Sequence, residues 1–252
     1  MFKELAFVAG ISLVTIGSAQ TFYSTGFDGG FANGQLSGQN GWAGTGTPSA
    51  NAFAVTSSRS FSLSNSVQIS QGSTDWAEIG GGNYAAPSSG DLYTTAHLYI
   101  DPTTATGRVF GLKVQNGSGA TPMYGVTVSG DGTVRIGKND WLFNSGTLTT
   151  NSALVGRWIS LSLDHVIASG VVHVLIESTD NSFANITGDI TGLSTSTFEN
   201  NSDLYSNYGS GSATGSAFFD DYRVASTPVP EPATLGFLSF GALAAMRRRR
   251  VR

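Results

Sequence analysis

The sequence contains no cysteine, only three histidines, and few charged residues for its 252-residue length. Without cysteine, a disulfide framework, a thiol nucleophile and a Cys-based zinc site are all excluded. Charged residues make up 12% of the chain, and 33 residues are glycine, which disfavours a bundle of long helices. Hydrophobic residues make up 40%, so the chain has enough apolar material for a core.

Charge is distributed unevenly along the chain. Residues 20–227 hold seven basic and fifteen acidic residues, a net charge of −8, and contain no basic cluster. This balance argues against nucleic-acid binding, which needs many contacts between basic side chains and phosphates. Residues 228–252 hold five arginines and one glutamate, Glu231. A basic end on an acidic body indicates a membrane contact made by the tail.

Residues Met1–Ala19 have the order of parts found in a secretory signal peptide. Lys3 provides a short basic start, Leu5–Ile16 an apolar stretch, and Gly17-Ser18-Ala19 the small residues that signal peptidase recognises. We therefore expect export and cleavage after Ala19. The alternative is an ordinary buried N-terminal helix.

The C-terminal end has three consecutive parts. Prolines 228, 230 and 232 form an extended spacer, because proline excludes a continuous helix. The uncharged run Ala233–Met246 follows, and as a helix it would be about 21 Å long, short for a hydrocarbon core of ~30 Å. Arginine side chains can extend toward the headgroups, so a short transmembrane helix is still feasible. The positive-inside rule then places Arg247, Arg248, Arg249 and Arg250 in the cytoplasm as a membrane stop, with the body outside.

This end resembles the PEP-CTERM protein-sorting signal, with Pro230, Glu231 and Pro232 as the sorting motif. The resemblance covers residues 228–252 and implies a substrate of exosortase in a Gram-negative bacterium that makes extracellular polysaccharide. It further implies a precursor anchored in the inner membrane and a product at the cell surface or in the extracellular matrix. The alternative for this segment is an amphipathic surface helix with a basic end.

The body, residues 20–227, is expected to form one β-rich domain. Apolar and polar residues alternate in six segments, the pattern of half-buried strands: Asp91–Ile100, Arg108–Gln115, Met123–Ser129, Arg157–Asp164, Val171–Ser178 and Ala217–Ala225. Ser129-Gly130-Asp131-Gly132 predicts a tight hairpin. Two stretches rich in glycine, serine and asparagine, 33–51 and 200–216, are expected to be surface loops. The sequence thus predicts an all-β fold, an antiparallel β-sandwich of jelly-roll type, flanked by an N-terminal signal helix and a C-terminal hydrophobic helix.

The body is also similar to concanavalin A-like lectin and glucanase domains. The similarity is carried by Phe27-Asp28-Gly29, by Gly38-Gln39-Asn40-Gly41-Trp42, by Gly156-Arg157-Trp158, and by Phe218–Val224 as a last strand. It implies that the first and last strands are neighbours.

No catalytic site is recognisable, so we predict a protein that is not an enzyme. Residues 20–227 contain three glutamates, Glu78, Glu177 and Glu199, which are widely separated. Asp75 and Glu78 come nearest to a carboxylate pair, but positions three apart on a strand point to opposite faces. The histidines, His97, His165 and His173, lack metalloprotease spacing and are expected to face solvent.

Calcium is the one cofactor that the sequence favours. Alternation along the last strand places Asp220 on the same face as Phe218, Tyr222 and Val224, where a carboxylate needs a partner or a metal. The concanavalin A-like resemblance implies a structural Ca²⁺ near the terminal strands, with Asp28 as a second ligand. The alternative is a hydrogen-bonded Asp220 without a metal.

Three functions remain open. The first is an exported, surface-sorted, non-enzymatic protein that serves in the extracellular matrix or envelope, or as a glycan-binding module. The aromatic residues Trp42, Trp76, Trp141 and Trp158 permit stacking on sugars, although core packing is the alternative explanation for most aromatics in a sandwich. The second is a secreted glycan-degrading enzyme whose carboxylates have not been recognised. The third is a structural envelope protein without a ligand. Signal peptidase, exosortase and extracellular polysaccharide are the expected partners.

Overall fold

The computed structural model describes residues 20–44, 52–71, 77–80, 91–116, 120–138, 146–195, 201–208 and 214–226. The expected signal helix within residues 1–19 and the expected hydrophobic helix within residues 228–252 lie outside the described residues. Among the residues that are described, no helix has the length and apolar character needed to cross a bilayer.

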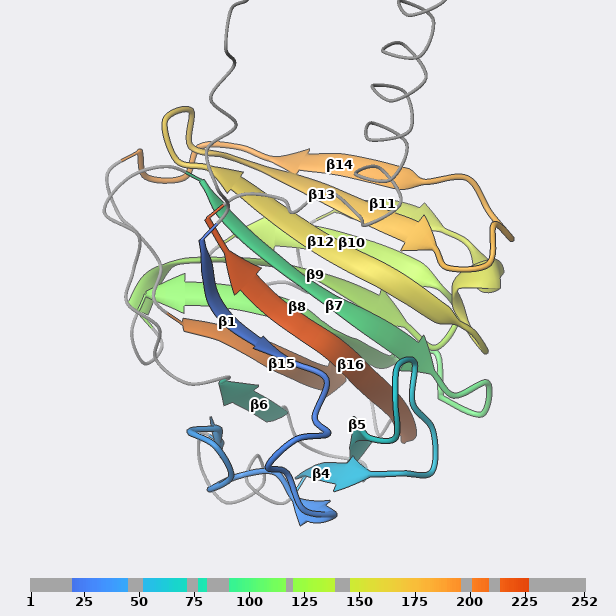
Figure 1. Cartoon of the computed structure of the whole chain (residues 1–252). Coiled ribbons are helices and arrows are strands. Elements are labelled where there is room, and N and C mark those ends of the chain that lie inside the picture. The colour runs from blue at the N-terminus through green and yellow to red at the C-terminus, as the bar shows by residue number, and fades with distance from the viewer. Residues whose placement is uncertain are drawn as a thin grey trace, which may run out of the picture.

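Two antiparallel sheets form the body, one in front of the other (Figure 1). The first sheet has the order β14-β13-β12-β7-β16-β5-β4-β2, with β1 also paired to β16. Its strands are β1 Thr21–Thr25, β2 Gly34–Gln35, β4 Phe53–Thr56, β5 Ser66–Gln71, β7 Leu92–Ile100, β12 Trp158–Val166, β13 Val171–Ser178, β14 Ile186–Ile190 and β16 Gly215–Ala225.

The second sheet has the order β11-β10-β9-β8-β15-β6-β3. Its strands are β3 Ala43–Gly44, β6 Ala77–Gly80, β8 Arg108–Asn116, β9 Ala120–Ser129, β10 Thr133–Lys138, β11 Thr147–Thr150 and β15 Asn201–Tyr208. A short 3₁₀ helix, η1 Ser152–Leu154, follows β11. The expected antiparallel β-sandwich is therefore confirmed, and the hairpin between β9 and β10 pairs Val128 with Val134 as predicted.

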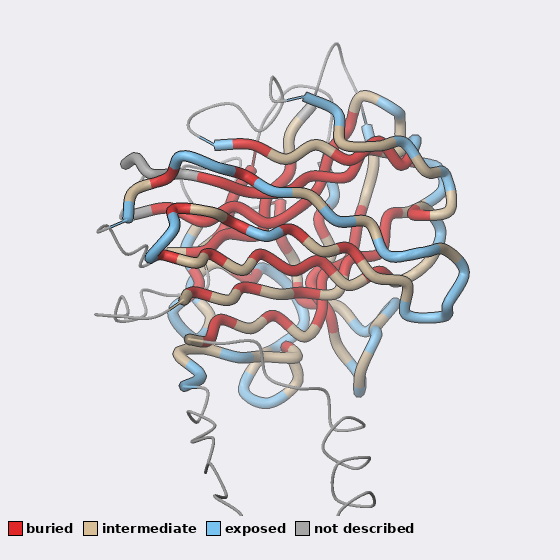
Figure 2. Tube along the Cα trace, turned by 90° about the horizontal axis from the view of Figure 1, so that it is seen from above, coloured by how far each residue is buried: buried red, intermediate tan, exposed pale blue. Residues whose placement is uncertain are grey.

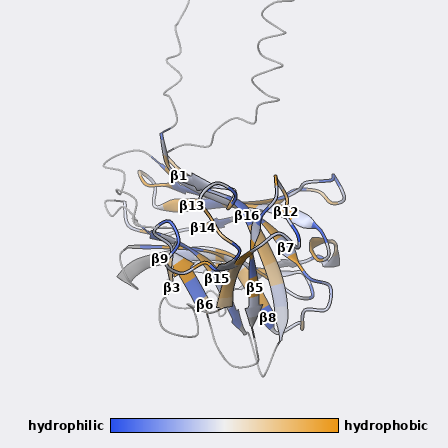
Figure 3. Cartoon of the chain, turned by 60° about the horizontal axis from the view of Figure 1, so that its bottom comes forward, coloured by the Kyte–Doolittle hydropathy of each residue, from blue (hydrophilic) through white to orange (hydrophobic). Residues whose placement is uncertain are grey.

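The core lies between the sheets because alternate residues of each strand point inward. In β12, Ile159, Leu161 and Leu163 are fully buried, whereas Trp158 and Ser160 on the other face are partly exposed. Figure 2 shows this alternation of buried and more exposed positions along the strands. Apolar residues are distributed along the strands of both sheets (Figure 3).

The two ends of the body meet at β16, as the concanavalin A-like resemblance implied (Figure 1). One edge of β16 pairs first with β5, from Gly215 to Phe219, and then with β1, from Tyr222 to Ala225. Trp42 lies close to both ends: its ring centroid is 5.4 Å from that of Phe27 and 5.2 Å from that of Tyr222. Three of the four segments that carried the resemblance, those with Phe27, Trp42 and Tyr222, are thus brought into one aromatic contact.

The predicted surface loop at residues 200–216 is wrong at residues 201–208 and 215–216, which belong to strands β15 and β16. Residues 201–208 form β15, which is paired on both sides, with β8 and with β6. Ser202, Leu204 and Ser206 are fully buried. The small polar residues made the segment look like a loop, but ladder hydrogen bonds on both edges satisfy its backbone, so it lies within the sheet. The other expected loop, 33–51, includes the short strands β2 and β3 and the buried Leu36 and Trp42.

Candidate functional site

A row of aromatic side chains crosses the outer face of the first sheet. Trp158, Tyr99 and Phe218 are direct cross-strand neighbours on β12, β7 and β16. The ring centroid of Tyr99 lies 5.8 Å from that of Trp158 and 6.1 Å from that of Phe218. Strand alternation puts all three on the face turned away from the core, because Ile159 and Phe219 beside them point inward.

The loop of residues 57–65, between β4 and β5, adds a fourth aromatic ring to this row. Phe61 stacks on His97 with ring centroids 3.7 Å apart, and its centroid is 5.8 Å from that of Trp158 in an edge-on contact. Phe61 is 40% exposed, whereas Tyr99 and Phe218 are below 10%. We call Phe61, His97, Tyr99, Trp158 and Phe218 the aromatic platform. Phe61, Trp158 and His97 are at least partly exposed, whereas Tyr99 and Phe218 are buried.

Aspartates hold the loop of residues 57–65 in place. Asp220 Oδ2 accepts hydrogen bonds from the backbone N–H groups of Phe61 and Ser62, at 2.8 and 3.0 Å. Asp221 Oδ1 accepts one from the Ser62 hydroxyl at 2.6 Å. Asp28 Oδ1 accepts two more, from the backbone N–H groups of Ser64 and Asn65, both at 2.9 Å. The position of Phe61 on the platform is therefore determined by carboxylates from the first and last segments of the body.

A β-bulge in β16 explains how two consecutive aspartates reach the same loop. The register with β7 shifts between Asp220 and Arg223, so β16 has one extra residue there. Asp221 takes a positive φ of 47°. The prediction that Asp220 shares a face with Tyr222 and Val224 is wrong, because the bulge reverses the alternation and turns those two side chains into the core. Simple counting along the strand cannot detect such an inserted residue.

The two consecutive aspartates have different electrostatic environments. Burial raises the pKa of Asp220 to about 6, although three backbone N–H groups, those of Ser62, Phe61 and Asp221, favour its anion. His97, followed by the Ser62 hydroxyl, lowers the pKa of Asp221. His97 Nδ1 lies 3.4 Å from Asp221 Oδ2, which is ion-pair distance rather than a well-formed hydrogen bond. Asp221, next to His97, therefore ionises at a lower pH than Asp220.

The calcium ligands expected from the sequence, Asp28 and Asp220, do lie at the same loop. Their oxygens mostly accept backbone hydrogen bonds, and within the described segments no group of three or more His, Asp or Glu side chains is arranged to hold a metal ion. Asp28 Oδ2 is buried and has no hydrogen-bond partner. Calcium binding by these residues stays a prediction, and their observed contacts match the alternative role of hydrogen-bonding the loop.

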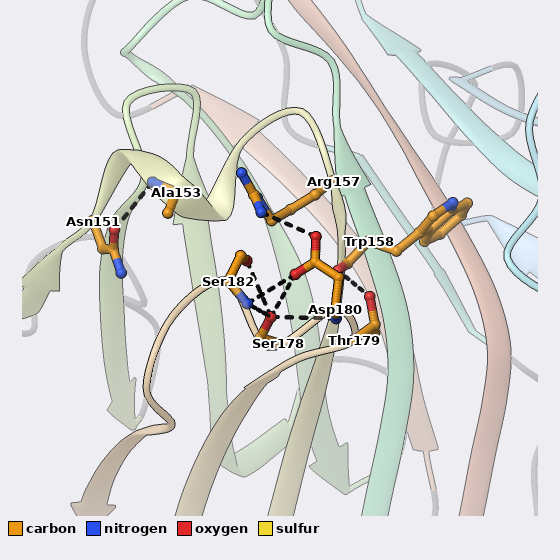
Figure 4. A network of polar contacts seen from close by, with 8 residues as sticks. All are labelled: Asn151, Ala153, Arg157, Trp158, Ser178, Thr179, Asp180 and Ser182. Carbon is orange, nitrogen blue, oxygen red and sulfur yellow. Dashed lines mark hydrogen bonds and ion pairs between the residues drawn. The ribbon is translucent and has the colours of Figure 1, made fainter.

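A polar network orders the other flank of Trp158 (Figure 4). Asp180 accepts hydrogen bonds from the Ser178 hydroxyl and the Ser182 backbone, and Arg157 Nη1 lies 3.0 Å from Asp180 Oδ2. Hydrogen bonds from Ser182 and Ser178 lower the pKa of Asp180 to about 2. The Thr179 hydroxyl donates to the carbonyl oxygen of Trp158 at 2.7 Å. Figure 4 shows the Trp158 ring pointing away from this network.

The second sheet carries a buried charged cluster on its outward face, which we call the acid–lysine triad: Glu78, Lys113 and Asp203. These side chains alternate with the core residues Ile79, Leu112 and Leu204, yet are at most 6% exposed. Lys113 Nζ forms an ion pair with Glu78 Oε2 and lies 4.0 Å from Asp203 Oδ2. Gln115 Nε2 donates to Asp203 Oδ2 at 2.8 Å.

One lysine cannot neutralise two buried carboxylates, and the pKa of Asp203 is raised as a result. Burial, reinforced by the charge of Glu78, raises the pKa of Asp203 to about 7. Asp203 is therefore close to half-protonated at neutral pH. Perturbed carboxylates of this kind are found at functional sites, although structural ion pairs produce them too.

Other predicted site residues have mixed outcomes. His173 is exposed and lies 2.7 Å from Asp189, as expected of a solvent-facing histidine. The same expectation for His165 is wrong: it is fully buried with its ring against Tyr124. Asp75, Trp76, Trp141, Glu199 and the tail residues Pro230, Glu231, Pro232 and Arg247–Arg250 lie outside the described residues.

Sequence reasoning missed Phe61 and the acid–lysine triad. For Phe61 no local pattern signals that an irregular loop will fold over a sheet. For the triad a signal was present, because Lys113 lies between Leu112 and Val114 in a predicted strand and therefore belongs to its outward face.

A family model of the PEP-CTERM protein-sorting motif matches residues 228–250. The chain carries a PEP-CTERM sorting motif. The motif implies an exported precursor that is anchored in a membrane and processed by exosortase. A search of curated proteins finds no significant sequence match to this chain.

Solved structures share the fold of the body. The cellulose-induced protein Cip1 aligns with a TM-score of 0.53 at 13% identity, over 82% of this chain and 98% of that one. A basic winged bean lectin in complex with Tn-antigen aligns with a TM-score of 0.54 at 10% identity, over 83% and 98%. A carbohydrate esterase from Shiga toxin-encoding bacteriophage phi24B aligns with a TM-score of 0.53 at 13% identity, over 83% and 100%. The PEP-CTERM motif is thus attached to a concanavalin A-like, lectin-type β-sandwich.

Proposed function

We propose that this chain is exported and sorted to the surface of a Gram-negative bacterium, where its β-sandwich binds glycan without modifying it. Signal peptidase removes residues 1–19, residues 20–227 form the body, and residues 228–252 hold the precursor in the inner membrane until exosortase cuts. The sorting motif, the lectin-type fold and the acidic body without a basic cluster support this assignment.

The observation that carries glycan binding is the aromatic platform. Aromatic rings provide flat apolar contact area, and pyranose rings present faces of C–H groups that pack on such rings. Phe61 and Trp158 offer these surfaces together on an outer sheet face, with Asp221 and His97 beside them as hydrogen-bonding groups. Because hydrogen bonds hold the Phe61 loop at five backbone or hydroxyl groups, little ordering entropy is lost when a ligand binds.

Affinity electrophoresis of the full chain through gels containing a panel of polysaccharides tests this function. At least one polysaccharide should retard the parent protein, and Phe61→Ala should restore its free mobility. Leu63→Ala is a matched control, because Leu63 lies in the same loop and is 84% exposed. If none of the polysaccharides retards the parent protein, a structural role in the envelope is the better description.

Sorting is tested separately in a host that contains exosortase. Changing Pro230, Glu231 and Pro232 to alanine should trap the unprocessed precursor in the inner membrane while leaving its melting temperature unchanged. Protease added to intact spheroplasts should digest the body, because the Arg tail faces the cytoplasm. Normal processing of the triple variant, or full protection of the body, would contradict the proposed sorting.

A second candidate function, glycan hydrolysis, is favoured by the acid–lysine triad. Asp203, with a pKa near 7, is in the range suited to a general acid at neutral pH, and Glu78 provides a second carboxylate on the same face. Release of reducing sugar from a polysaccharide panel, abolished by Asp203→Asn and by Glu78→Gln, would establish the enzyme. Equal, background release by parent and variants would reject it.

A further inference from the structure

Arg59 lies over the aromatic platform, with its guanidinium against the rings of Tyr99 and Phe218. The guanidinium carbon is 3.9 Å from the ring centroid of Tyr99 and 5.6 Å from that of Phe218. Arg59 is exposed, belongs to the loop of residues 57–65, and its carbonyl oxygen accepts a hydrogen bond from the Ser66 hydroxyl. Stacking on a ring orients the guanidinium but leaves its in-plane N–H donors available.

No carboxylate of the described chain lies within 4.0 Å of the Arg59 guanidinium. The acid that responds to its charge is Asp101, whose pKa is lowered mainly by hydrogen bonds from Thr103 and to a smaller extent by Arg59. The Asp101 carboxylate accepts from the Thr103 backbone and hydroxyl at 2.9 and 2.7 Å, so it is already hydrogen-bonded locally.

The two other arginines at this sheet differ from Arg59 because both have protein partners. Arg157 pairs with Asp180, and Arg223 Nη2 donates to the Thr21 hydroxyl at 2.7 Å. Among the described residues Arg59 thus has no ion-pair partner; it lies two residues along the loop from Phe61 and is linked to it through Tyr99 and Trp158.

We infer that the platform is selective for glycans that carry an anionic group, a carboxylate or a sulfate, which Arg59 binds while a sugar ring of the same chain stacks on Phe61 and Trp158. The inference rests on the proposed glycan binding and names its ligand class. A guanidinium matches such groups because two parallel N–H donors can contact two oxygens. The body as a whole carries −8, so general attraction of polyanions cannot replace this local contact.

The test uses affinity electrophoresis and titration of the full chain with three probes: alginate, which carries carboxylates, a sulfated galactan, and neutral dextran. The parent protein should bind one or both anionic polymers more tightly than dextran, and the affinity should fall as salt rises from 50 to about 300 mM, because screening weakens exposed charge pairs. The anionic polymer that binds better identifies the group that is recognised.

Arg59→Gln should weaken binding to the anionic polymer by about tenfold to hundredfold, the range expected for a charge-assisted contact, while dextran binding stays as weak as in the parent. Arg59→Lys should give an intermediate affinity, since the charge remains but the paired donors are lost. Arg223→Gln is the control, because this arginine already has its partner in Thr21. Melting temperatures of all variants within about 2 °C of the parent would show that the fold is retained.

The outcomes separate the inference from the proposed function. If neutral and anionic polymers bind equally well and Arg59→Gln changes neither, the charge selectivity is overturned while glycan binding stands. If no polymer binds the parent protein, both are overturned. If Arg59→Gln and Arg223→Gln weaken binding of the anionic polymer equally, the effect comes from the net charge of the protein, and the assignment to Arg59 is wrong.

Discussion

Because Asp203 shares one lysine with Glu78, lowering the pH from 8 to 5 should stabilise this protein. The stability of most proteins changes little over that pH range. The pKa of Asp203 is raised from an ordinary 3.8 to about 7 in the folded state. A raised pKa means that the proton binds more tightly to the folded than to the unfolded chain. The resulting stabilisation is complete below pH 3.8 and is lost as the pH rises through 7. Between pH 5 and pH 8 the loss is about 3 kcal/mol.

Thermal unfolding of the full chain, followed by circular dichroism at pH 5, 6, 7 and 8, measures this effect. For a domain of this size, about 3 kcal/mol corresponds to a fall in melting temperature of roughly 6–12 °C from pH 5 to pH 8. Asp203→Asn should reduce that fall, because asparagine does not titrate and can still accept the hydrogen bond from Gln115. Burial also raises the pKa of Asp220, to about 6, so a smaller fall of the same sign should remain.

Two further variants locate the cause. Glu78→Gln leaves Lys113 with a single carboxylate, so the pKa of Asp203 should drop. The fall in melting temperature from pH 5 to pH 8 should then also be smaller than in the parent protein. Asp180→Asn is the control: the pKa of Asp180 is about 2, so this carboxyl is ionised throughout the range and its removal should not change the slope. If the melting temperature of Asp203→Asn falls from pH 5 to pH 8 as far as that of the parent, the triad does not hold a proton and the reasoning fails.

Three other predictions concern the fold and the loop of residues 57–65. Gly111→Ala should unfold the body, because its Cβ would lie 1.8 Å from a carbonyl oxygen of β9, whereas Gly29→Ala has open space and should be neutral; equal melting temperatures would refute this. Asp220→Ala should destabilise the body by about 2–4 kcal/mol and expose the loop to proteases, as limited proteolysis with mass spectrometry would detect. If calcium binds at Asp28 and Asp220, 1 mM of it should raise the melting temperature in a way that EDTA reverses. No shift would leave hydrogen bonding as their role.

The strands of the body could largely be predicted from local patterns. Asp91–Ile100 and Val171–Ser178 alternate apolar and polar residues, and the structure has β7 and β13 there because a half-buried strand requires that alternation. The PEP-CTERM motif was equally local, since a sorting signal is read as a short extended sequence. β15 was not predictable in the same way: its serines and asparagines have no strong strand preference, and pairing on both edges made it a strand.

The candidate site depended on contacts that no local pattern encodes. Asp220 was noticed because a carboxylate interrupts apolar positions, but the β16 bulge beside it lies where the partner strand on one edge changes from β5 to β1, which no local pattern reveals. Phe61, Arg59 and Asp203 acquire their properties from residues far away in the chain: His97, Tyr99 and Lys113. The sequence by itself determined the sorting motif, the fold class and which strands face a core, because these depend on residue type and spacing. Only the tertiary structure decided which loop covers the outer face and which two carboxylates share one lysine, because stacking and charge coupling act over a few ångströms between residues that folding brings together.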